Sequence, residues 1–144
     1  MTLPVSGALP ERVIRAIPLA AMSERFKQLQ AQAQAVVEET IAALPKPIRS
    51  RAAGLPVTYD ARPQQWLLDD GFEPDILGLF IGSAWAEAEA DPLPPQIVLF
   101  IENIRDFAEE DDEIFREEIR TTYLHELGHY LGLDEIDLGE RGLD

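Results

Sequence analysis

The sequence predicts a small α+β domain with a three- or four-stranded sheet. Two long segments with helical periodicity lie toward the two ends of the chain, and short β-prone runs lie between them. The length of 144 residues fits one domain with a single core. Hydrophobic residues make up 46% and charged residues 27%, which is the composition of an ordinary folded protein.

The first helix is expected to begin at Ser23, a good N-cap residue that is followed by apolar residues at helical spacing. Pro45 and Pro47 should end it, because proline disrupts a helix interior. Residues 1–22 contain prolines and lack a clean periodicity. We therefore expect an extended or partly disordered segment at 1–22, ahead of a domain that spans 23–144.

Three β-prone runs follow, at residues 55–60, 76–82 and 96–104, and the third is the longest. A second long helix should begin within the acidic run at 109–113 and end at Gly132. The acidic run also suggests a cation site. The favourable interaction of acidic side chains with a helix N-terminus is the simpler explanation.

The net charge excludes some classes of partner. The chain has 27 acidic and 12 basic residues, a net charge of −15 and a pI near 4.4. Such a charge repels nucleic acids and anionic membranes. Solubility is its main expected effect, and attraction of basic substrates is the second.

The N-terminus lacks the features of a signal peptide, and no segment is long enough to span a membrane, so we expect a cytoplasmic protein. The sequence has no cysteine, which excludes thiolate chemistry and cysteine-bound zinc. Its oligomeric state is left open.

Both histidines of the chain lie in one HExxH motif, formed by His125, Glu126 and His129. On a helix, residues spaced four apart share a face, so the two imidazoles can bind one ion. Zinc suits these donors, and Glu126 could act as general base toward a water that the metal activates. A lone HExxH also arises by chance in unrelated helices, but the presence of both histidines in it favours a metal site.

A third protein ligand must be acidic, since no other histidine and no cysteine is present. The sequence continues as HExxHxxGxxE, in which Gly132 permits a turn and Glu135 follows it. Glu135 is the first choice as third ligand, Asp134 is the second, and Asp137 is a further candidate. Tyr59, Tyr123, Tyr130 and Arg141 are available to stabilise an oxyanion, and the sequence does not choose among them.

The segments "LGLFIG", "LPPQIVLFIENI" and "TTYLHELGHYLGLDE" resemble the small bacterial zincin-like metallopeptidase family, formerly a domain of unknown function. The likeness extends from about residue 23 to 138. It implies a minimal zincin-like fold, in which an N-terminal helix and an HExxH active-site helix pack with the small sheet. It also implies Zn²⁺ held by His125, His129 and Glu135, with Glu126 as general base. Aspartate is common at the third-ligand position of the family, so Glu135 departs from that pattern in length.

The resemblance implies a zinc-dependent metallopeptidase that hydrolyses peptide bonds in a peptide or unfolded protein. It further suggests that residues 96–104 form an edge strand that pairs with substrate. Glu102 or Asn103 near its end would then contact the substrate. The alternative for this segment is a core strand. The alternative function is a metal-binding interaction module with little or no catalysis, while the acidic pI disfavours a metal-dependent ribonuclease.

Overall fold

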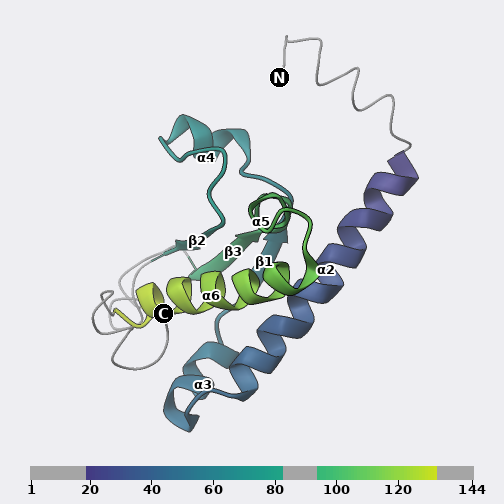
Figure 1. Cartoon of the computed structure of the whole chain (residues 1–144). Coiled ribbons are helices and arrows are strands. Elements are labelled where there is room, and N and C mark those ends of the chain that lie inside the picture. The colour runs from purple at the N-terminus through teal and green to yellow at the C-terminus, as the bar shows by residue number, and fades with distance from the viewer. Residues whose placement is uncertain (1–18, 83–93, 133–144) are drawn as a thin grey trace.

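The computed structural model describes residues 19–82 and 94–132. Five helices and three strands in these residues form an α+β fold (Figure 1). The helices are α2 (Leu19–Ala42), α3 (Lys46–Ala53), α4 (Gln65–Asp69), α5 (Ile101–Phe107) and α6 (Asp112–Tyr130). The strands are β1 (Val57–Asp60), β2 (Gly78–Ile81) and β3 (Gln96–Phe100). The predicted fold class is confirmed: a small α+β domain whose strands lie between two long helices in the sequence.

The long helix α2 begins at Leu19, so the prediction that it starts at Ser23 is wrong. It ends at Ala42, and after Pro45 the chain enters α3, which carries Pro47 in its first turn. Proline is tolerated there because the first helical N–H groups have no intrahelical partner. The predicted segment 1–22 is therefore helical in its last residues, and residues 1–18 lie outside the described part. None of the described helices is long and apolar enough to cross a membrane.

The sheet has the strand order β1-β3-β2, with β1 parallel and β2 antiparallel to β3. The central strand β3 has apolar neighbours on both of its faces. Ile97 and Leu99 face the main core formed with α2, α5 and α6, while Val98 and Phe100 pack with Leu67 of α4. This pattern explains why β3 is a continuous apolar run rather than an alternating one.

The β-prone run predicted at 96–104 is a strand only as far as Phe100, and the chain then turns directly into α5. Ile101, Ile104 and Ala108 are buried at helical spacing, so tertiary packing overrides the β preference of isoleucine. The prediction that this run forms an edge strand is also wrong, because β3 has a partner strand on each side.

Asn103 is a structural residue rather than a contact for substrate. Its side chain is 5% exposed, and its amide donates to the backbone carbonyls of Pro74 and Ile76, both at 2.8 Å. Its carbonyl accepts from Arg62 at 2.6 Å, and Arg62 also pairs with the exposed Asp106. These bonds hold the segment before β2 against α5.

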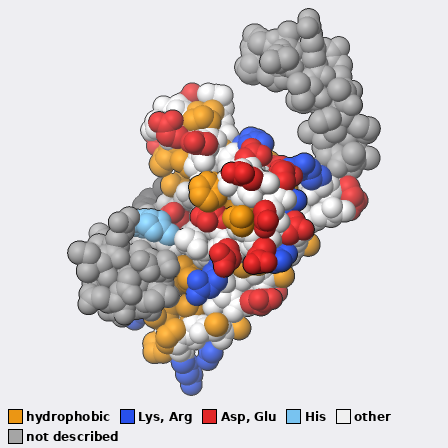
Figure 2. Space-filling view, viewed as in Figure 1, with side chains coloured by type: hydrophobic (Ala, Val, Ile, Leu, Met, Phe, Trp, Pro, Cys, Tyr) orange, Lys and Arg blue, Asp and Glu red, His pale blue; other side chains and the backbone are white. Residues whose placement is uncertain are grey.

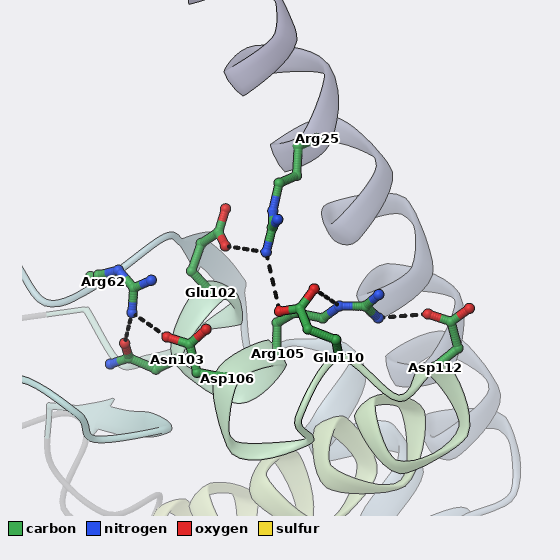
Figure 3. Close-up of polar contacts among 8 residues, drawn as sticks. All are labelled: Arg25, Arg62, Glu102, Asn103, Arg105, Asp106, Glu110 and Asp112. Carbon is green, nitrogen blue, oxygen red and sulfur yellow. Dashed lines mark hydrogen bonds and ion pairs between the residues drawn. The ribbon is translucent and has the colours of Figure 1, made fainter. Parts of the chain in front are cut away.

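A second polar cluster joins α2, α5 and the turn before α6 (Figure 3). Arg25 of α2 pairs with Glu102 at 3.3 Å and with Glu110 at 3.4 Å. Arg105, only 16% exposed, pairs with Glu110 and donates to Asp112 at 2.6 Å, which holds the pKa of Asp112 below its usual range. Glu102 is thus a partner of α2, and the expectation that it contacts substrate has no support in this geometry.

A glycine allows β2 to approach α6 closely. A Cβ atom at Gly78 would lie 2.6 Å from the Thr122 Cγ2 atom, a distance that van der Waals repulsion excludes. Gly78 pairs with Leu99 of β3, so the β2 edge of the sheet lies close to α6 at this point.

We expect Asn103→Ala to lower the free energy of unfolding by about 1–3 kcal/mol, because it removes a buried amide and leaves the backbone carbonyls of Pro74 and Ile76 without their donor. Asp106→Ala is the matched control, since it removes an exposed partner of the same Arg62 and should cost less than about 1 kcal/mol. Urea denaturation measures both. Equal losses would contradict the structural role given to Asn103.

Gly78→Ala should lower the free energy of unfolding by about 1–3 kcal/mol, because the new methyl group overlaps the Thr122 methyl. Adding Thr122→Ser removes that methyl and should recover part of the loss, which a double-mutant cycle reports as a coupling energy. Gly54→Ala is the control, because its Cβ would meet nothing nearer than 3.8 Å. Additive effects of the two substitutions would show that the close contact is not the cause.

Candidate metal centre

The helix that carries the motif has defined ends. The Asp111 side chain caps its N-terminus by accepting a hydrogen bond from the Ile114 N–H at 2.9 Å. Gly132 follows its C-terminus with φ 77°, a left-handed conformation that glycine adopts without steric cost. Both predicted boundaries are confirmed.

One face of α6 is fully buried, and it fixes the rotation of the helix about its axis. Phe115, Ile119, Tyr123, Leu124 and Leu127 are each at most 1% exposed. The helix packs with them against α2, α5, β2 and β3. The HExxH residues lie beside this buried face, where α6 meets β2.

The structure brings His125, Glu126 and His129 together. One ligand atom from each lies within 4.8 Å of the others, and the two histidine Nε2 atoms are 3.2 Å apart. Two nitrogens at 2.0–2.1 Å from one tetrahedral zinc ion would be separated by about 3.3 Å. The imidazole pair therefore fits zinc, and Figure 2 shows histidine side chains exposed at the surface.

Glu126 is half-buried, and its carboxylate accepts a hydrogen bond from the backbone N–H of Phe80 in β2. Burial raises the pKa of Glu126, while both histidines and the Phe80 N–H act in the opposite direction. The carboxylate is thus held beside the imidazoles by the sheet.

The pairing register explains why this N–H is available. Phe100 N–H donates to Leu77 O, so Leu77 directs its backbone groups toward β3, and in an antiparallel strand alternate residues do the same. Gly78 and Phe80 therefore direct their N–H and C=O groups away from β3. Within the described residues β2 has a partner on one side only, so these groups form the free edge beside α6.

The tyrosines considered for an oxyanion role lie away from the cluster or are covered. Tyr123 is fully buried, and burial raises the pKa of its hydroxyl. Tyr130 is 7% exposed and packs its ring at 5.7 Å from that of Phe80. Burial, aided by Glu38 of α2, raises the pKa of Tyr59 to about 12. Burial of Tyr123 and Tyr130 disfavours both as oxyanion donors, and Arg141 lies outside the described residues.

The candidate third ligands Glu135, Asp134 and Asp137 also lie outside the described residues. The described part therefore supplies two imidazoles and one carboxylate, and the prediction of Glu135 stays a prediction. The sequence did not predict that the free edge of β2 would lie beside Glu126. No local pattern in the apolar run around Phe80 indicates that its N–H would hold Glu126.

A scan against protein families matches residues 52–143 to the family described as zincin-like metallopeptidase. The matched range begins within α3, includes the whole sheet and α6, and extends past the candidate third ligands. A search of curated proteins finds no significant match. The match covers well over half of the chain and agrees with the histidine pair on α6, so the chain belongs to the zincin-like metallopeptidase family.

Proposed function

We propose that this protein is a zinc-dependent peptidase whose metal is held by His125, His129 and an acidic residue after Gly132. The observation that carries the proposal is the pair of Nε2 atoms 3.2 Å apart with the Glu126 carboxylate beside them. Family membership supports metal-dependent hydrolysis of peptide bonds as the reaction class.

A zinc ion at this position would polarise a substrate carbonyl and lower the pKa of a water molecule. Glu126 is the base that removes a proton from the attacking water and can deliver it to the leaving amine. The Phe80 N–H lies beside the Glu126 carboxylate and favours its charged form, which is the form that accepts a proton.

The free edge of β2 is the natural place for the substrate backbone. An extended peptide can add to an exposed sheet edge through main-chain hydrogen bonds, and Gly78 and Phe80 direct carbonyls toward that edge. This mode places the scissile bond next to Glu126. It requires an extended segment, so unfolded chains and short peptides are the expected substrates.

Glu126→Gln should lower kcat/KM on a fluorogenic peptide library by about 10²–10⁴-fold while zinc content, measured by mass spectrometry, stays at one per chain. The amide keeps the size of the side chain but cannot accept the proton. Glu117→Gln, an exposed neighbour on the same helix, is the control and should retain activity.

Two results would contradict the proposal. The first is a wild-type protein that contains no zinc after purification and binds none when zinc is added. In that case the two imidazoles would only form a hydrogen bond with each other. Bound zinc without cleavage of any peptide would favour the non-catalytic interaction module.

The third ligand is testable with two adjacent isosteric changes. Glu135→Gln should weaken zinc affinity by at least about 100-fold, because even substitutions around metal ligands cost about 10–100-fold. Asp134→Asn should leave affinity within about tenfold of wild type. Competition with a chelating dye measures both constants, and the reverse order would assign the ligand to Asp134.

A further inference from the structure

A groove of about 350 Å³ adjoins the metal centre. Its walls come from the segment that enters β2 and from α6. The lining residues are Ile76, Leu77, Gly78, Glu118, Thr121, Thr122, His125 and Glu126. Because His125 and Glu126 belong to the HExxH motif, a side chain in this groove would extend from a residue near the reacting bond.

The two walls differ in chemistry. Ile76 and Leu77 supply apolar surface on one side, while Glu118 supplies a carboxylate on the other. Within the described ranges, Glu118 has no ion-pair or hydrogen-bond partner. Partial burial and the neighbouring Glu117 raise its pKa, so the charged carboxylate is less well solvated than an exposed one. A cation would stabilise it.

Helix geometry sets the length of the side chain that could reach this carboxylate. Glu118 precedes Glu126 by two turns of α6, which is about 12 Å along the helix axis. An extended peptide advances about 3.3 Å per residue, so a residue two positions from the reacting bond covers about half of this distance. A long side chain covers the rest, with its methylene groups along Ile76 and Leu77. Lysine and arginine have both the length and the positive end.

We infer that this groove is a specificity subsite for a lysine or arginine side chain of the substrate, with Glu118 as the partner of its cationic end. The inference rests on the proposed function, since a peptide must lie along β2 for its side chain to enter. The net charge of −15 attracts basic peptides in general, whereas Glu118 selects a position within the peptide.

The test uses zinc-loaded full-length protein and pairs of peptides that differ only in lysine or methionine near the cleaved bond. Methionine is similar in length and uncharged. Wild type should prefer the lysine peptide by about tenfold in kcat/KM, and Glu118→Gln should lose most of that preference. Glu117→Gln, whose carboxylate lies outside the groove, should retain it.

A charge reversal separates recognition from a merely structural role. Glu118→Lys should shift the preference from the lysine peptide toward a glutamate peptide, which loss of stability alone would not do. A lysine preference that is absent in wild type, or that survives both Glu118 substitutions, overturns the inference.

Equilibrium binding of the same peptides distinguishes this inference from the proposed function. If the zinc-loaded protein cleaves no peptide, the peptidase proposal fails. The subsite is still supported if wild type binds the lysine peptide about tenfold tighter and Glu118→Gln does not. Equal binding of the lysine and methionine peptides by wild type refutes the subsite.

Discussion

The packing of α6 against the sheet is the constraint on which the candidate metal centre depends. Phe115, Ile119 and Tyr123 are fully buried and recur every four residues, so the helix has one rotation that satisfies its core. Each residue advances the helix by about 100°. A shift by a single residue would carry Glu126 away from the Phe80 N–H and expose one of the large core side chains. Burial of one face of α6 therefore fixes the direction in which the HExxH side chains point.

The small size of Gly78 contributes to the surroundings of Glu126. A carboxylate loses hydration when it is partly buried, and this loss disfavours its charged form. The close approach of β2, which only a residue without Cβ permits beside Thr122, provides the Phe80 N–H that partly offsets the loss. The surroundings of the proposed base are therefore built by the sheet as well as by the helix.

The features that the sequence predicts well are local ones. The helical spacing of His125 and His129 fixes their proximity, and the acidic run at 109–113 and Gly132 mark the ends of α6. The first contains the capping side chain of Asp111, and the second adopts a left-handed backbone. The strand order and the β2 edge depend on pairing between distant segments, which short patterns do not specify. The α5 helix was missed because Ile101 and Ile104 favour strands, whereas their buried spacing in the fold is helical.

Net charge alone could not locate the groove, because most acidic side chains of such a chain are solvated and weakly selective. The structure separates two carboxylates of α6 from the rest by their burial. Glu126 has the imidazoles and a backbone N–H beside it, whereas Glu118 has the repulsion of Glu117 and no partner among the described residues. A charge interaction strengthens as water is removed, so the partly desolvated carboxylate without a partner gains most from a cation. Burial thus sets Glu126, the proposed base, and Glu118, the proposed partner of a cation, apart from the other carboxylates of α6.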